Sequence, residues 1–172
     1  MKEFYFVTSN KNKIKEAEEI LGIKLKHIDL DIQEIQSIDV EDIVKDKAVK
    51  AFNVIKKPVL VEDTGLFIKD WRGFPGALIK WILKTMGIKE FSRLALNKKA
   101  VAACAACVSD GKKFIIAVGK VEGKIVRPRG ISGFGWDSIF QPKGYNKTFA
   151  QLDKQKISHR RKALIKLRKN LE

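Results

Sequence analysis

The chain has 172 residues, 45% hydrophobic and 32% charged, which is typical of a single globular domain with a sizeable core. It has no run of about 18 apolar residues and starts with a strand-like segment, so we expect neither a membrane span nor a signal peptide and predict a cytoplasmic location. A net charge of +15 favours an anionic partner: nucleic acid, an anionic surface or a phosphorylated small molecule.

The first part of the chain alternates between strand and helix patterns. A strand at about 3–8 precedes a helix at about 11–22, and residues 23–30 alternate apolar and polar side chains as a strand does. A second helix is predicted at about 41–55. The apolar residues 59–65 then predict a short buried strand that ends in a turn.

The second part begins with two helical segments and continues with a hairpin, in which "SDGKK" is the turn signal. After a glycine-rich loop, a short strand and a last helix close the chain. The predicted ranges are 76–87 and 88–96 for the helices, 99–109 and 113–121 for the hairpin strands, and 158–171 for the last helix. This order predicts one α/β domain over residues 1–172, with helices on the faces of a mixed, bent sheet and two lobes around a cleft.

The stretch "TSNKNKIK" (8–15) places three lysines near the positive end of a predicted helix, where acids are usual. Hydroxyl and amide groups of Thr8, Ser9 and Asn10, helix N–H groups and the Lys13 ammonium could together bind phosphate there. A simple cap by Ser9 or Asn10, with solvated lysines outside, explains the residues equally well.

In "VEDTGL", the acids Glu62 and Asp63 follow an apolar strand, where burial is costly without a cation. Carboxylates at the end of such a strand stand where ligands bind in open α/β sheets, and hard oxygens suit Mg²⁺. The alternative is a turn in which Asp63 caps Thr64 and Gly65. We favour the functional interpretation.

Two later segments break the pattern too. In "SGFGWD", Phe134 and Trp136 flank Gly135, and such rings can stack on a nucleobase, although alternating aromatics also form the core face of a strand. In "KISHRRK", Ser158 is a good N-cap for the last helix, and His159 and Arg160 then place donors in its first turn.

Cys104 and Cys107 form a CxxC inside an apolar strand-like run. Residues three apart on a strand point to opposite faces, and no helix start is present to lower a thiol pKa. We therefore predict two buried structural cysteines and not a redox or zinc pair.

Taken in order, six segments resemble the inosine/xanthosine triphosphate pyrophosphatase family, which removes deaminated purine nucleotides. They are residues 6–16, 31–37, 59–68, 74–83, 133–152 and 156–164. The resemblance implies a two-lobed α/β homodimer that uses Mg²⁺, with Mn²⁺ as an alternative. It also implies a reaction in which water attacks the α-phosphorus of ITP, dITP or XTP and pyrophosphate leaves.

The resemblance also implies roles for individual residues. Glu34 and Asp63 match the acids that bind metal and activate water, Glu62 is a further candidate ligand, and Lys13 joins the catalytic set. The implied substrate contacts are Thr8, Ser9, Asn10, Lys13, Lys47 and Lys80 around the phosphates, and Phe134, Gly135, Trp136, Asp137, Lys154, Ser158, His159 and Arg160 around the base.

Two other functions stay open on the sequence: a basic nucleic-acid-binding module and a pyrophosphatase for other modified nucleotides. Against the first, the unusual lysines lie beside carboxylates and helix starts, whereas a nucleic-acid binder usually has a continuous basic face. We therefore expect a small-molecule nucleoside triphosphate as partner, with no stable nucleic-acid or membrane partner.

Overall fold

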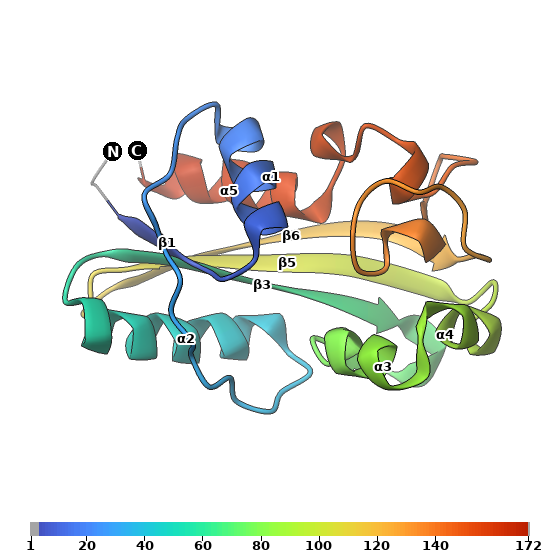
Figure 1. Ribbon diagram of the computed structural model, residues 1–172, viewed down its shortest axis with the longest axis horizontal. Coiled ribbons are helices and arrows are strands. Elements are labelled where there is room, and N and C mark those ends of the chain that lie inside the picture. Colours follow the sequence, from blue (N-terminus) through green and yellow to red (C-terminus); the bar gives the residue numbers. More distant parts are fainter. Residues whose placement is uncertain (1–3, 172) are drawn as a thin grey trace.

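The computed structural model describes residues 4–171, which form a mixed sheet of seven strands with helices on both faces (Figure 1). The sheet order is β2-β1-β3-β5-β6-β7, with β4 also paired to β3. The strands are β1 (Tyr5–Val7), β2 (His27–Ile28), β3 (Val59–Ile68), β4 (Pro75–Gly76), β5 (Lys99–Ser109), β6 (Phe114–Ile125) and β7 (Phe140–Pro142). The helices are α1 (Lys11–Leu21), α2 (Val40–Ile55), α3 (Ile79–Met86), α4 (Ile88–Leu94) and α5 (His159–Leu171).

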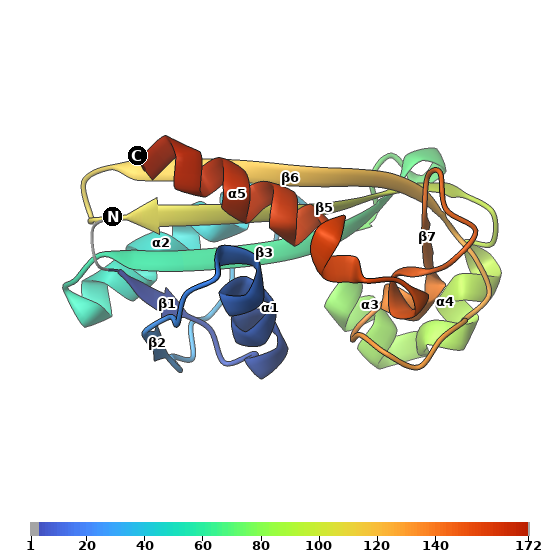
Figure 2. The same cartoon turned by 90° about the horizontal axis from the view of Figure 1, so that it is seen from above.

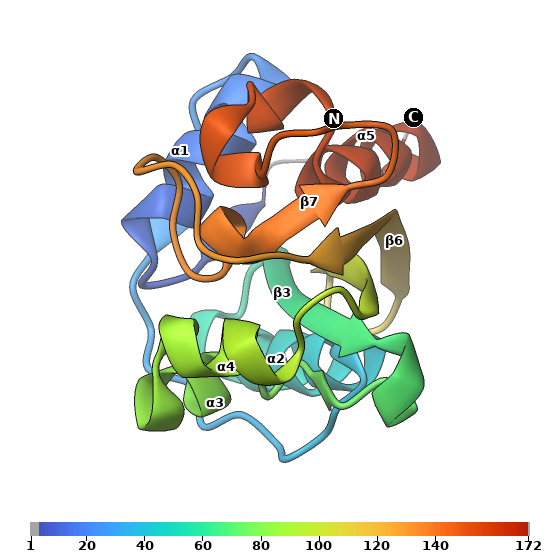
Figure 3. The same ribbon diagram turned by 90° about the vertical axis from the view of Figure 1, so that its right-hand side faces the viewer.

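Three long antiparallel strands, β3, β5 and β6, run the length of the molecule. The shorter strands extend this sheet, and the helices pack on its faces. Helices α1 and α5 cover one face, and α2, α3 and α4 cover the other (Figure 1). From above, β1, β2 and α1 lie at one end and α3, α4 and β7 at the other (Figure 2). Seen from that second end, α3 and α4 lie on one side of β3, and β7 lies on the other (Figure 3). This arrangement confirms the predicted mixed α/β sheet.

Each face of the sheet buries its own core. Leu60, Cys104 and Ala106 pack under α1 and α5, whereas Val61 and Cys107 pack under α2. A third core fills the other end of the molecule and contains Phe91, Trp136, Phe140 and Phe149. Among the described residues, no helix is long and apolar enough to cross a membrane.

The prediction for the cysteines is confirmed. Both are free and buried, and they belong to cores on opposite faces because they lie three residues apart on β5. Burial raises the pKa of the Cys107 thiol to about 12 and raises that of Cys104 well above its usual value. Neither thiol is therefore poised as a thiolate nucleophile.

The element boundaries differ from the prediction in two places that matter. Strand β3 does not end in a turn after residue 65 but continues to Ile68, because β5 pairs with it along its whole length. Of the strand predicted at 23–30, only His27 and Ile28 pair, with β1. The predicted helices are all present, within a few residues of their expected ends.

Gly119 of β6 sets the distance between α5 and the sheet. A β-carbon at this position would lie 2.1 Å from the carbonyl oxygen of His159 and 2.3 Å from the amide nitrogen of Ala163. Because both contacts are to helix backbone, no side-chain rotation can relieve them. Helix α5 therefore rests directly on the strand, with its first turn held against β6.

We expect Gly119→Ala to destabilise the protein by about 1–3 kcal/mol, the usual cost of overpacking a close contact. The extra methyl must lift α5 and the residues at its start, so substrate turnover should fall as well. Urea denaturation and turnover measurements check this. Lys120→Ala, at the exposed neighbouring position, is the matched control, and a Gly119→Ala variant as stable as that control would contradict the close contact.

Candidate active site

The edge of β3 that carries Glu62 and Asp63 is unpaired. On this side, β1 pairs with β3 only as far as Leu60, and β4 begins to pair at Leu66. The two acids thus lie in mid-strand, which corrects the prediction that they end a strand in a turn. They lie beside the carboxyl end of the neighbouring parallel strand β1, where the chain turns into α1. The carboxyl end of a parallel strand is where ligands usually bind in open α/β sheets, so the two acids still lie at such a position.

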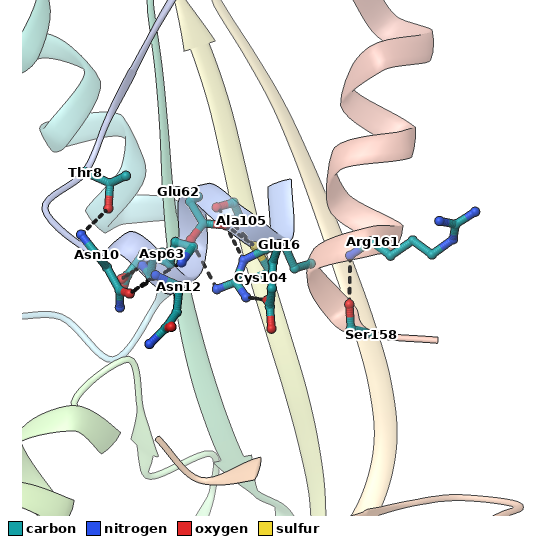
Figure 4. Close-up of polar contacts among 12 residues, drawn as sticks. Thr8, Asn10, Asn12, Glu16, Glu62, Asp63, Cys104, Ala105, Ser158 and Arg161 are labelled. Carbon is teal, nitrogen blue, oxygen red and sulfur yellow. Dashed lines mark hydrogen bonds and ion pairs between the residues drawn. The ribbon is translucent and has the colours of Figure 1, made fainter. Parts of the chain in front are cut away.

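The turn into α1 is held by side chains of the opening motif (Figure 4). The Thr8 hydroxyl accepts a hydrogen bond from the Asn10 amide (3.2 Å). The Asn10 side-chain oxygen accepts from the amides of Asn12 (3.0 Å) and Lys13 (3.4 Å), which makes Asn10 the N-cap. Ser9 is exposed at the tip of this turn. The predicted cap is confirmed.

Lys13 is not a solvated lysine outside that cap. Its ammonium lies 3.2 Å from an oxygen of Glu62 and 3.8 Å from an oxygen of Asp63, and its side chain is only 13% exposed. Burial disfavours the charge of Lys13, but the two carboxylates outweigh it and raise its pKa. The cation at the start of α1 is therefore balanced by acids of the protein itself.

Behind Lys13, a buried chain of ion pairs crosses the molecule. Glu62 accepts two hydrogen bonds from Arg160, from Nε at 2.7 Å and from Nη2 at 3.2 Å. Nη1 of Arg160 bonds to Glu16, whose other oxygen lies 2.8 Å from the ammonium of Lys154. Lys154 in turn lies 2.8 Å from Asp137. Opposite charges alternate along this ion-pair chain, which links β3, α1, α5 and the glycine-rich loop.

The surroundings shift the pKa values of the two neighbouring acids of β3 in opposite directions. Burial opposes the charge of Glu62, but Arg160 and Lys13 outweigh it and hold its pKa well below the usual value. For Asp63, burial dominates and raises the pKa, although Lys13 and Lys47 act against it. The Cys104 thiol, 3.6 Å from Glu62, adds a donor to that carboxylate (Figure 4). Glu62 is thus a fixed counter-charge, whereas Asp63 is the more basic carboxylate.

Three lysines surround Glu34, on the loop before α2. The Lys47 ammonium lies 2.7 Å from its carboxylate, and the charges of Lys13 and Lys80 also act on it. Burial opposes ionisation, but these cations outweigh it and lower the pKa of Glu34. Because the charge of Glu34 also acts on Asp63, the two acids and the three lysines form one electrostatic cluster.

The aromatic pair of the glycine-rich loop divides into one core residue and one accessible residue. Trp136 is 7% exposed and stacks on His159 with ring centroids 5.2 Å apart. Phe134 is only half-buried, and its ring covers the Lys154 ammonium at 4.4 Å and the Arg160 guanidinium at 5.6 Å. Of the two rings, Phe134 is the one that a ligand can reach.

Asp137 fixes the shape of this loop. Its carboxylate accepts from the Phe134 amide (2.9 Å) and binds Lys154, which ties the loop to the ion-pair chain. Gly133 has a φ of 81°, and a β-carbon there would lie 2.5 Å from Asp137. Gly135 has open space around it. A cavity of about 190 Å³ opens between residues 130 and 138.

The first turn of α5 is buried. Ser158 accepts from the Arg161 amide (3.1 Å), which confirms the predicted cap. His159 and Arg160 are 2% and 1% exposed. Burial, reinforced by the charges of Arg160 and Lys154, lowers the pKa of His159 well below its usual value, so the ring is neutral. Its Nδ1 atom is buried without a hydrogen-bond partner.

Residues 4–170 match the model of the Ham1 family. The chain belongs to the Ham1 family. This confirms the resemblance read from the six segments. The chain is 43% identical over 173 residues to the inosine triphosphate pyrophosphatase of Phaeosphaeria nodorum, covering 95% of this chain and 90% of that protein. It is 40% identical over 182 residues to the dITP/XTP pyrophosphatase of Ignicoccus hospitalis, covering 99% and 97%.

Solved Ham1 structures share this fold. The Staphylococcus aureus Ham1 protein superposes with a TM-score of 0.84 at 28% identity, covering 99% of this chain and 98% of that one. A HAM1 protein from Coxiella burnetii gives the same TM-score at 29% identity. The overall fold of this chain is therefore shared with these two Ham1 proteins.

In this Ham1 chain, the sequence reasoning missed Glu16. It lies 9% exposed between Arg160 and Lys154 and holds both cations. A signal was present, because a spacing of three residues places Glu16 on the same helix face as Lys13. Its partners lie more than 130 positions away, so only the fold shows what it binds.

The candidate metal ligands of this Ham1 chain were Glu34, Asp63 and Glu62. Both oxygens of Glu62 already face Arg160 and Lys13, which leaves Glu34 and Asp63 as the carboxylates for a divalent ion. The described residues contain no group of three or more metal-ligating side chains. Two carboxylates fit Mg²⁺ when substrate phosphates and water supply its other ligands.

We expect Glu62→Gln to destabilise the protein by about 3–5 kcal/mol, because the buried charge of Arg160 loses a partner. Glu62 has a pKa below its unfolded value, so wild-type stability should fall as the pH drops below about 4.3, where the unfolded chain takes up a proton that the folded chain does not. The variant should lack this part of the slope. Urea denaturation between pH 3 and 7 measures both effects.

Glu90→Gln is the matched control, because Glu90 forms an exposed pair with Arg93. Exposed pairs contribute little, so this variant should unfold like the wild type. If the two variants lose the same free energy of unfolding, the buried ion pair of Glu62 contributes no more to stability than an exposed pair does.

Proposed function

We propose that this chain hydrolyses deaminated purine nucleoside triphosphates, namely ITP, dITP and XTP, to the monophosphate and pyrophosphate. Its Ham1 relatives named as inosine triphosphate and dITP/XTP pyrophosphatases support this substrate class. The single structural observation behind the reaction is Asp63, a basic carboxylate on an unpaired strand edge, next to Lys13 and the start of α1.

We propose Asp63 as the general base. Its raised pKa makes it a better proton acceptor than an ordinary carboxylate. Asp63 takes one proton from water while the water oxygen forms a bond to the α-phosphorus. The bond between that phosphorus and the bridging oxygen breaks, and the electron pair leaves with pyrophosphate. Glu62, held by Arg160, keeps Lys13 beside Asp63.

The phosphates are proposed to bind the lysines of the electrostatic cluster. Lys13, Lys47 and Lys80 surround the two acids from three different elements, and phosphoryl transfer depends chiefly on such charge stabilisation. A triphosphate brings negative oxygens that replace Glu34 as partner of Lys47. Thr8, Ser9 and Asn10 at the start of α1 add hydroxyl and amide groups on the same side.

A divalent ion fits this site as a complement to the lysines. Glu34 and Asp63 would hold it, and when bound it would supply charge stabilisation at the phosphates. We propose Mg²⁺, with Mn²⁺ as an alternative, because hard oxygen ligands suit both metals.

The base is proposed to bind at the other end of the ion-pair chain. Phe134 now covers Lys154 and Arg160, so it must turn aside to expose them, and its ring can then stack on the base. Trp136 and Gly135 shape the loop, Ser158 caps the helix, and Asp137 and Lys154 hold the loop in place. The unpartnered Nδ1 of His159 supports a polar ligand there.

Selectivity follows from donors in that region. Among the described residues, Arg160 makes one hydrogen bond from each of its three nitrogens, which leaves two further N–H groups for an acceptor. Hypoxanthine and xanthine present a carbonyl at position six, whereas adenine presents an amino group. A donor facing that amino group would stay unpaired, which is enough to reject adenine by orders of magnitude.

The homodimer and the cytoplasmic location stay predictions, as does activity on other modified nucleotides. The third of these differs from the proposed function only in the base, so a panel of substrates separates the two.

With Mg²⁺, we expect pyrophosphate release from ITP, dITP and XTP to exceed that from ATP by at least about 100-fold in kcat/KM. Asp63→Asn should reduce turnover of ITP by about 10² to 10⁴-fold, because it removes the base while keeping the shape. Asp70→Asn, on an exposed ion pair with Lys98, is the matched control and should leave turnover unchanged. Equal rates on ATP would refute the proposed selectivity, and a fully active Asp63→Asn would refute the role of Asp63.

Lys13→Met should raise KM for ITP and shift the pH profile. Activity needs ionised Asp63, so kcat/KM rises as the pH increases through the Asp63 pKa. Lys13 lowers that pKa, so its removal should move the acid limb of the profile to higher pH. Lys11→Met, at the exposed position two residues before, is the control. An unmoved acid limb would show that Lys13 does not act on the base.

A further inference from the structure

The outward side of α5 is a basic surface without acids. The helix has six Lys or Arg residues among its 13 positions and no Asp or Glu. Ala163, Leu164 and Leu167 face inward and are buried against the sheet. Most of the remaining positions are cationic, whereas an ordinary solvated helix face mixes both signs of charge.

These cations line a groove of about 370 Å³ along the helix. We call it the α5 groove. From Lys162 to Lys169 the helix advances about 10 Å, so the charges form an extended row and not a point. The groove is lined by Ile157, Ile165 and five cations, Lys156, Arg161, Lys162, Lys166 and Lys169.

Most of this charge is not neutralised within the protein. Lys156 pairs with Asp153 at 3.0 Å, and the Lys162 ammonium donates to the carbonyl of Lys120. Over residues 4–171, no acidic side chain forms an ion pair with any of the other three lining cations, Arg161, Lys166 and Lys169. This contrasts with Arg160 and Lys154 on the inward side, which are both paired with buried acids.

The backbone of α5 has a fixed position on the sheet. Gly119 brings α5 into backbone contact with β6, and Figure 2 shows α5 lying along β6. The helix that carries the cations is therefore ordered before a ligand binds, so binding orders only their side chains.

We propose that the α5 groove binds the phosphate backbone of duplex nucleic acid without reading its sequence. The sequence argued against a nucleic-acid partner because its unusual lysines did not form a continuous basic face, and the folded helix supplies such a face. The lining contains no aromatic side chain on which single-stranded bases could stack. Leu164 and Leu167 of α5 are buried, and Ile165 and Leu171 are partly buried, so little apolar surface is available to insert into a membrane.

The test is fluorescence anisotropy with a labelled 20-base-pair DNA of arbitrary sequence, at several KCl concentrations. Five phosphate contacts predict a slope of about −4 to −5 for log K against log salt. The triple variant Arg161→Gln, Lys166→Gln, Lys169→Gln should bind more weakly, with a slope less steep by about 2 to 3. The control variant Lys89→Gln, Lys99→Gln, Lys147→Gln removes the same charge from exposed positions elsewhere and should keep the wild-type slope.

Three results would overturn the proposal. They are no duplex binding by the wild type, equal loss in the two triple variants, and a groove variant that loses binding to phosphatidylserine vesicles while it keeps binding to DNA. The groove variant should release pyrophosphate from ITP at the wild-type rate, because none of its changes touches the candidate active site. A failure of the groove is therefore separable from a failure of the proposed enzyme activity.

Discussion

The candidate site depends on the ion pairs of the Arg160 guanidinium, which is buried between Glu62 and Glu16. A buried charge is costly unless its hydrogen bonds and counter-charges are all in place, and the planar fork of arginine binds a carboxylate bidentately only in defined geometries. The three residues come from α5, β3 and α1. Their pairing therefore fixes how two helices lie against the strand that carries Asp63.

The same chain of ion pairs connects the two ends of the proposed substrate site. At one end, Lys13 joins Glu62 to Asp63, where the phosphates are proposed to bind. At the other, Lys154 joins Glu16 to Asp137, which shapes the loop that carries Phe134. Each charged group in this chain shares a partner with the next, so the strand edge and the glycine-rich loop are held by one continuous set of ion pairs.

The large positive charge of the protein falls into two groups with different environments. Inward-facing cations such as Lys13 and Arg160 are balanced by buried acids; both lower the pKa of Glu62, and Lys13 also acts to lower that of Asp63. On the outward side of α5, Arg161, Lys166 and Lys169 form no ion pair with an acidic side chain of residues 4–171. The inward group shifts the pKa values of nearby carboxylates, whereas the outward group is available to attract a polyanion at the surface.

The sequence determined the helices, the two buried cysteines and the family, because these depend on local spacing, caps and motif order. Charges placed against helix ends drew attention to Lys13, His159 and Arg160, whereas Glu34, Lys47, Lys80 and Lys154 came only from the resemblance to the family. Tertiary structure decided the rest. Because β5 pairs with β3 along its whole length, β3 continues beyond Asp63 instead of ending there. Glu16 forms ion pairs with Lys154 and Arg160, which lie more than 130 positions away in the sequence. Ion pairing and strand pairing depend on distances in space, and a single sequence does not contain them.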